Sequence, residues 1–158
     1  MAEAPLRHFL GEVVLDEVSL APASPEQEHE RSIAVADLLK ANSFQPEGGA
    51  GGPYTLRIGL VEDRLALDIA GEGLAVRHIL SLAPFRRIVR DYLTVCRSYH
   101  EAMRAAGPAQ IEAIDMGRRG LHNDGAALLI ERLKGKVAVD PATARRLFTL
   151  LCALHWRG

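Results

Sequence analysis

The chain has 158 residues, of which 48% are hydrophobic and 25% charged, a composition typical of a soluble globular protein with one core. No run of about 18 apolar residues occurs, which excludes a membrane-spanning helix, and the first ten residues lack the apolar stretch of a secretory signal. The net charge of −1 combines two opposite halves: residues 1–76 hold 5 basic and 13 acidic residues (−8), and residues 77–158 hold 14 and 7 (+7).

The first half of the chain predicts strands around one helix. Residues 6–20 are rich in Val and Leu and predict one long or bulged strand, and residues 25–41 predict a helix with apolar positions three and four residues apart. Residues 42–53 contain two prolines and four glycines and predict a mobile loop. Alternating apolar residues then predict three strands, the first two joined as a hairpin: residues 54–61, 64–70 and 74–82.

The second half predicts helices. Apolar residues recur every three or four positions from Phe85 to Met103 and predict a long amphipathic helix, which Gly107 ends before Pro108 opens the next. We expect that next helix to end at Gly120, which can adopt the left-handed conformation common at helix C-termini. Three further elements are expected: a helix over 124–134 capped by Asn123, a short extended connector over 137–139, and a last, central helix capped by Asp140.

These elements predict one α+β domain over residues 1–158. Residues 1–82 would form a small antiparallel sheet of about four strands with one early helix, and residues 83–158 a layer of about four helices. The opposite charges of the two halves predict either that the halves pair with each other or that the basic half meets an anionic partner.

The segment 115–125 is the first candidate for a functional site. If one helix ends and another begins there, free backbone N–H groups would face an anion, and nearby arginines could bind a carboxylate or phosphate at two points. A histidine in the segment could then carry a proton near neutral pH. The candidate residues are Asp115, Arg118, Arg119, His122, Asn123 and Asp124. The alternative is structural, with the glycines and Asn123 as helix caps and Asp115 in an ordinary helical ion pair.

Arg86 and Arg87 are a second pair of candidate anion ligands. They lie at the start of the long helix, where positive charge opposes the helix dipole, so some negative group should offset them. That group is either an acidic side chain of the first half or a bound anion. Arg145 and Arg146 raise the same question more weakly near the start of the last helix.

The sequence predicts no metal site and no cofactor. The histidines have no ligand spacing, and no phosphate loop, dinucleotide fingerprint or serine-nucleophile motif occurs. Cys96 and Cys152 fall within helical apolar patterns, without a Cys-x-x-Cys spacing, and are expected to be buried, reduced thiols. The charged run Glu28–Arg31 is expected to be a solvated helix start, because adjacent residues of a helix point in different directions.

Four blocks of this sequence, Glu28–Arg31, Ser81–Val89, Ala113–Gly125 and Leu154–Gly158, together resemble an uncharacterised alphaproteobacterial protein family of unknown function. The resemblance extends over most of the chain and implies a small cytoplasmic bacterial protein, without implying an activity or any catalytic residue. The family commonly has serine at position 83, where this chain has Ala83; if that serine caps the long helix, then here either Ser81 caps it or the cap is lost.

Three functions remain open from the sequence. The first is a non-enzymatic binding or regulatory module in the cytoplasm, whose basic half docks an acidic protein partner or a second copy of the chain. The second is an anion- or nucleotide-handling enzyme that uses the 115–125 cluster. The third is an RNA-binding protein, against which the net charge of −1 and the aromatic content of 5% both argue. The lack of a catalytic constellation favours the first, and neither nucleic acid nor a membrane is an expected partner.

Overall fold

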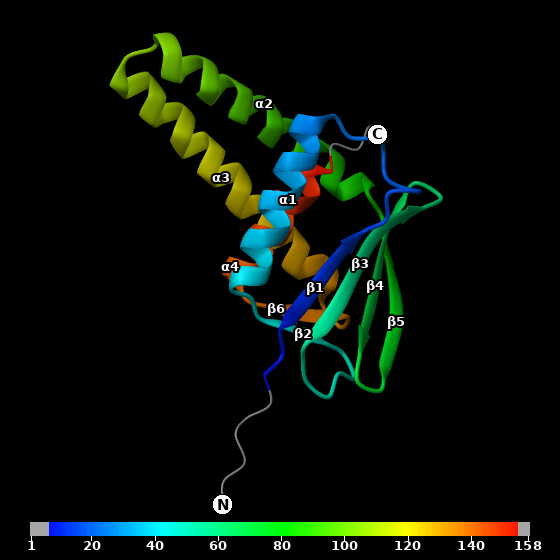
Figure 1. Ribbon diagram of the computed structural model, residues 1–158. Coiled ribbons are helices and arrows are strands. Elements are labelled where there is room, and N and C mark those ends of the chain that lie inside the picture. Colours follow the sequence, from blue (N-terminus) through cyan, green and yellow to red (C-terminus); the bar gives the residue numbers. More distant parts are fainter. Residues whose placement is uncertain (1–6, 155–158) are drawn as a thin grey trace, which may run out of the picture.

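The computed structural model of the chain describes residues 7–154, which form four helices and six strands (Figure 1). The predicted α+β class is confirmed. The main sheet has the strand order β1-β3-β4-β5, with the bounds β1 Leu10–Leu15, β3 Tyr54–Val61, β4 Arg64–Gly71 and β5 Leu74–Leu80. A second, two-stranded sheet joins β2 (Phe44–Pro46) to β6 (Val137–Val139). The helices are α1 (Pro25–Lys40), α2 (Ala83–Ala105), α3 (Pro108–Leu133) and α4 (Pro141–Ala153).

The main sheet is mixed, whereas the sequence predicted an antiparallel one. β1 pairs with β3 in parallel, because the chain between them crosses over through α1 and β2 before it returns to the sheet. The predicted strand over 6–20 is also too long: β1 ends at Leu15, and Asp16 then turns the chain by accepting hydrogen bonds from Ser19 Oγ (2.6 Å) and from the backbone N–H of Leu20 (3.0 Å). The predicted bulge is present as a register shift between Leu10 and Glu12.

The predicted hairpin of β3 and β4 is confirmed. Glu62 and Asp63 form its turn at φ values of 50° and 60°, the left-handed geometry that two-residue hairpin turns require. The strand after it ends at Leu80 rather than at residue 82. The predicted loop over 42–53 contains a short strand, because Phe44–Pro46 forms β2 and pairs with β6.

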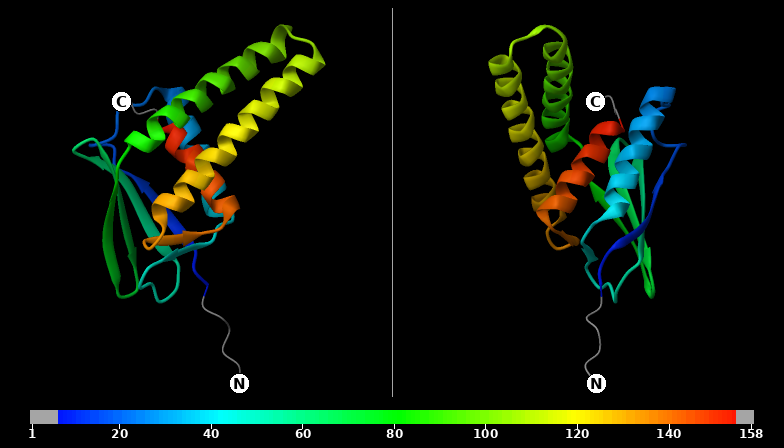
Figure 2. Two further views of the ribbon diagram at one scale, coloured as in Figure 1. Left: turned by 180° about the vertical axis from the view of Figure 1, so that it is seen from behind. Right: turned by 60° about the vertical axis from the view of Figure 1, so that its left-hand side comes forward.

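The core lies between one face of the main sheet and the helices α1 and α4, which cover that face (Figure 2). Eight of the 13 residues of α4 are buried, which confirms the prediction that the last helix is central. The largest fully buried side chains come from all layers: Leu10, Leu38, Phe44, Tyr54, Leu56, Ile58, Leu65, Ile69, Phe85, Leu129, Leu133 and Phe148.

Three of the four helices begin at the residues that the sequence predicts. Ser24 and Gln27 cap α1 reciprocally, and Asp140 caps α4 through the backbone N–H of Thr143 (3.0 Å). The start of α2 lacks a side-chain cap at the adjoining residue, and the hydroxyl of Ser81 accepts a hydrogen bond from the Ala83 N–H at 3.3 Å. Ser81 therefore takes the part expected of it where Ala83 replaces serine.

The largest correction concerns α3, which runs unbroken from Pro108 to Leu133. The expected helix end at Gly120 and the expected cap at Asn123 are both wrong. Gly117 and Gly120 are tolerated inside the helix because each costs only about 1 kcal/mol relative to alanine, less than the packing of α3 along α2 contributes. The C-terminal layer thus has three helices instead of about four in residues 83–154.

The helices α2 and α3 form an antiparallel hairpin that projects beyond the rest of the molecule (Figures 1 and 2). Their 23 and 26 residues correspond to about 35 and 39 Å of helix. Near its base the hairpin packs on α4, where Gly125 of α3 lies against the ring of Phe148. At the far end of α2 the side chain of Met103 is 57% exposed, so no other element covers this residue as Val89 is covered near the base.

Candidate functional site

The continuous α3 removes the premise of an anion site at a helix N-terminus, because the backbone N–H groups of residues 123–126 lie inside the helix. Asp115 instead binds the two neighbouring arginines, accepting from Arg118 Nε at 3.1 Å and pairing with Arg119 Nε at 3.2 Å. The Arg118 guanidinium lies 4.8 Å from the centre of the Tyr99 ring on α2. These contacts join α2 to α3 and give the arginines a partner within the hairpin.

His122 lies at the base of the hairpin, where α3 crosses α4. Its ring is 5.4 Å from the Tyr92 ring and 5.7 Å from the Phe148 ring. Its Nε2 lies 2.8 Å from Thr149 Oγ1, and that hydroxyl donates its own hydrogen to the Arg145 carbonyl oxygen (3.1 Å), so Nε2–H is the donor to Thr149. Burial lowers the pKa of His122, and the charges of Arg145 and Arg118 lower it further.

His122 should make folding stability depend on pH. Because its folded-state pKa lies below the ordinary value of 6.5, the unfolded state binds more protons between those two values, and stability rises with pH across that window. The stabilisation is complete above pH 6.5 and declines as the pH falls toward the folded pKa. Urea unfolding from about pH 5 to 8 should give a shallower dependence for His122→Gln than for the wild type. The neighbouring Asn123→Gln variant should keep the wild-type slope, and equal slopes for all three would contradict the assignment.

The remaining candidate residues lie on other faces of the hairpin. Arg87 and Asp124 line an open depression of about 490 Å³ between α2 and α3, and Arg87 lies 3.9 Å from Asp91, one turn further along α2. The other six candidates are not part of that lining. Arg86 and Asn123 are exposed. The structure therefore gathers Asp115, Arg118 and Arg119, places Arg87 with Asp124, and leaves the eight residues without a common focus.

A line of arginines follows the outer face of α2, and the sequence analysis did not single it out. Its members are Arg86, Arg90, Arg97 and Arg104, at spacings of four, seven and seven residues. Seven residues are nearly two helical turns, so the four side chains share one face over about 27 Å of helix. All four are exposed, and none forms an ion pair within residues 7–154. We call this set the arginine stripe.

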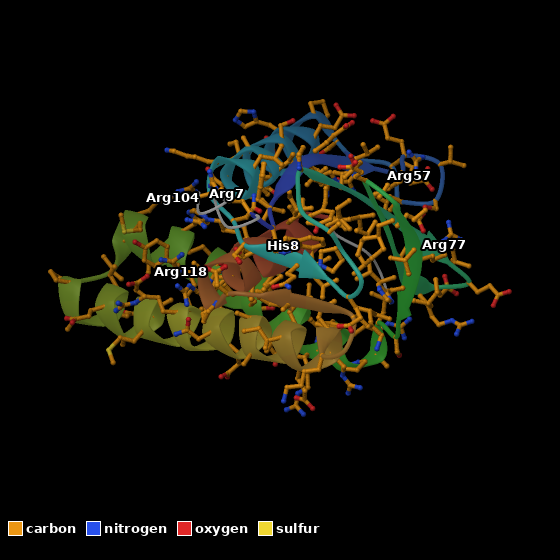
Figure 3. The ribbon with its side chains drawn as sticks, turned by 90° about the horizontal axis from the view of Figure 1, so that it is seen from below. Arg7, His8, Arg57, Arg77, Arg104 and Arg118 are labelled. Atoms are coloured by element: carbon orange, nitrogen blue, oxygen red, sulfur yellow. The ribbon has the colours of Figure 1, made fainter. Side chains whose placement is uncertain are left out.

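The two oppositely charged halves do not neutralise each other through ion pairs. Within the described part of the chain, one of six ion pairs joins residues 1–76 to residues 77–158: Arg77 with Asp68, at 2.6 Å between adjacent strands. Arg77 lies on the sheet at one end of the molecule, whereas Arg104 lies on the hairpin toward the other end (Figure 3). Within the described residues, the basic side chains of the hairpin therefore form no ion pair with the acidic half of the chain.

Arg31 was expected in a solvated helix start and is instead 8% exposed, which corrects that prediction. Its Nε and Nη2 donate to the carbonyl oxygens of Ala153 (3.3 Å) and Leu154 (2.8 Å) at the end of α4, and Nη2 also donates to Ala21 (3.3 Å). In the reverse direction, Arg146 of α4 donates to the Ala41 carbonyl at the end of α1 (2.7 Å). The two antiparallel helices thus cap each other's carbonyl ends.

A groove of about 820 Å³ separates α1 from β1, the edge strand of the main sheet. Its apolar floor is half-buried and packs on the core: Val13, Leu15, Val35 and Leu39. Glu17 and Glu28 lie in its lining. Arg31 also lines the groove, which therefore combines an apolar floor with two acidic side chains and one basic side chain.

Both cysteines are free, with Cys152 buried and Cys96 half-buried. Burial raises the pKa of each thiol, which keeps both protonated and poorly nucleophilic at neutral pH. Within residues 7–154, no three histidine, cysteine, aspartate or glutamate side chains group as metal ligands would. In the same range no helix is long and apolar enough to cross a membrane.

Comparison with known proteins identifies a family. The model of the uncharacterised protein family UPF0262 matches residues 7–157. A UPF0262 protein of Phenylobacterium zucineum is 61% identical over 99% of this chain and 98% of its own length, and one of Caulobacter vibrioides is 56% identical over the same shares. A UPF0262 protein of Azorhizobium caulinodans is 56% identical over the full length of both chains. No solved structure matches.

Proposed function

Since this chain belongs to the uncharacterised protein family UPF0262, we propose a function from the geometry of its own surface: it is a non-enzymatic binding module that docks an acidic protein partner on the arginine stripe of α2. The resemblance inferred from the sequence to an alphaproteobacterial family is confirmed at this level. A cytoplasmic location is part of the proposal and is supported by two free, protonated thiols.

The single observation that carries the proposal is that none of the four stripe arginines forms an ion pair with any residue that the structure describes. Four exposed arginines in one line create a positive field over about 27 Å, and Glu101 is the acidic residue of α2 that flanks it. A second helix or a strand with carboxylates at matching intervals could contact all four, because guanidinium groups bind carboxylates at two points. The hairpin projects from the body, so such a partner would meet no obstruction from the sheet.

The anion-handling alternative has no comparable support. Arg118 and Arg119 already bind Asp115, and the expected helix N-terminus is absent from the described chain. For RNA, the stripe offers positive charge, but its exposed face lacks tyrosine, phenylalanine or tryptophan for bases to stack on. The acidic protein partner is the function that remains.

A direct test uses poly-L-glutamate as the probe and fluorescence anisotropy as the measurement. The triple variant Arg90→Ala, Arg97→Ala, Arg104→Ala should bind the polymer about tenfold more weakly than the wild type, because exposed ion pairs contribute up to about 1 kcal/mol each. A matched control with the same loss of charge is the triple variant Arg64→Ala, Arg132→Ala, Lys134→Ala, and it should bind like the wild type.

Two results would contradict the proposal. Equal weakening by both triple variants would mean that the polymer senses net charge and not the stripe. Tighter binding of polyuridylate than of poly-L-glutamate at the same salt concentration would assign the surface to RNA instead.

A further inference from the structure

We propose that the partner is a second copy of this chain: the projecting end of one α2–α3 hairpin inserts into the groove between α1 and β1 of the other copy. This inference rests on the proposed docking function, and it adds the identity of the partner and the surface that receives the hairpin. Two observations carry it: the apolar face of α2 ends in the exposed Met103, and an apolar groove is lined by Glu17 and Glu28 with Arg31 as its one basic residue.

The apolar face of α2 continues beyond the body of the protein. Phe85, Val89, Tyr92, Cys96, Tyr99 and Met103 recur at steps of three and four residues and therefore share one face. Along this face exposure rises from 0% at Phe85 and 4% at Val89 to 57% at Met103. Tyr92, Cys96 and Tyr99 are half-buried, so the outer end of this face offers one exposed apolar side chain, Met103, to a partner.

Positive side chains border the exposed end of this face on both sides. Arg104 of the arginine stripe follows Met103 directly, and Arg118 of α3 lies across from it over the Tyr99 ring. Both arginines lie on the projecting hairpin in Figure 3. Arg118 is already paired with Asp115, so Arg104 beside the exposed Met103 is the arginine that this end of the hairpin offers to a partner.

The groove offers the complementary pattern. Its floor is apolar, its volume of about 820 Å³ can hold several side chains, and Glu17 or Glu28 could meet Arg104 of the incoming hairpin. Its wall includes β1, an edge strand, and an edge that a partner covers is protected from unwanted pairing. The acidic half of one copy would then neutralise the basic half of the other, as the ion pairs within one copy do not.

Each copy carries both a hairpin end and a groove, so a two-fold arrangement satisfies both contacts in a closed dimer. Light scattering after gel filtration at high micromolar concentration should give the wild type twice its chain mass of 17.2 kDa. Met103→Glu on the hairpin and Ala36→Arg in the groove should each raise the dimer dissociation constant at least about tenfold. Both positions are exposed, so the variants should keep the wild-type circular dichroism and melting temperature.

Matched controls separate these contacts from general surface effects. Met116→Glu changes a methionine of α3 that is 61% exposed, and Ile33→Arg changes a residue of α1 that is 48% exposed and outside the groove lining. Both controls should remain dimeric. Mixing Met103→Glu with Ala36→Arg should restore a dimer, because the mixed pair regains one intact contact between a wild-type hairpin and a wild-type groove.

A wild type that is monomeric at every concentration overturns the inference, as does a mixture that fails to associate or a Met116→Glu variant as defective as Met103→Glu. A monomeric wild type that still binds poly-L-glutamate through the stripe overturns the second-copy inference alone. A wild type that dimerises as described but ignores the polymer overturns the stripe proposal alone.

Discussion

Replacing Arg31 by alanine should lower the free energy of unfolding by about 3 kcal/mol. The guanidinium is buried and donates to the carbonyl oxygens of Ala21, Ala153 and Leu154, two of which lie at the C-terminal end of α4. Those oxygens lack the N–H partners that residues inside a helix have. The alanine variant leaves them buried without a donor, and each hydrogen bond to a charged group contributes about 1.5–3 kcal/mol.

Urea unfolding at neutral pH measures this loss. Arg31→Lys should fall between the wild type and the alanine variant, because an ammonium group keeps the charge but cannot span three carbonyl groups with one planar fork. His29→Ala, on an exposed position of the same helix, should stay within about 0.5 kcal/mol of the wild type. If Arg31→Ala costs no more than His29→Ala, the buried guanidinium does not tie the two helices together.

Gly125→Ala should destabilise the protein by a net amount of about 1 kcal/mol although alanine is the better helix former. A β-carbon at this position would collide with the ring of Phe148, which is fully buried in α4 and has no room to move away. Overpacking of this kind costs about 1–3 kcal/mol, more than the gain of about 1 kcal/mol in helix propensity. Thermal unfolding followed by circular dichroism should therefore give a lower Tm.

The same helix supplies the control for this prediction. A β-carbon on Gly120 would meet no heavy atom within 4 Å, so Gly120→Ala should raise stability by about 1 kcal/mol. The two substitutions are chemically identical and five residues apart. Their stability changes should have opposite signs because only the packing around the new methyl group differs. A stabilising Gly125→Ala would mean that α3 does not approach α4 as closely as described.

Local sequence signals predicted most of the secondary structure. The apolar spacing over residues 25–41, the cap residue Asp140 and the paired apolar alternation of β3 and β4 each act within a short stretch of chain, and the helices and hairpin that they predict are present. The errors in predicted secondary structure arose where contacts between distant parts of the chain determine the strands. The parallel pairing of β1 depends on a crossover of some forty residues, and the short strand β2 exists because β6 lies beside it.

The candidate site was predicted less well, for a physical reason. Glycine and asparagine look the same in the sequence whether they end a helix or lie inside one. Here α3 continues through residues 115–125, and its packing on α2 stabilises the continuous helix. Arg31 gave no local signal of burial, since its carbonyl partners on α4 lie 122 and 123 residues away. The arginine stripe could have been found from its spacing of four, seven and seven residues.

The projecting hairpin is also a lever. It is held at its base by the contact between Gly125 and Phe148, and about 26 Å of α3 separates Gly125 from Pro108. A pivot of about 10° at the base would sweep the far end through about 4 Å, a displacement comparable to the width of a side chain. Small changes in how α3 packs on α4 at Gly125 would thus be magnified at the far end of the hairpin.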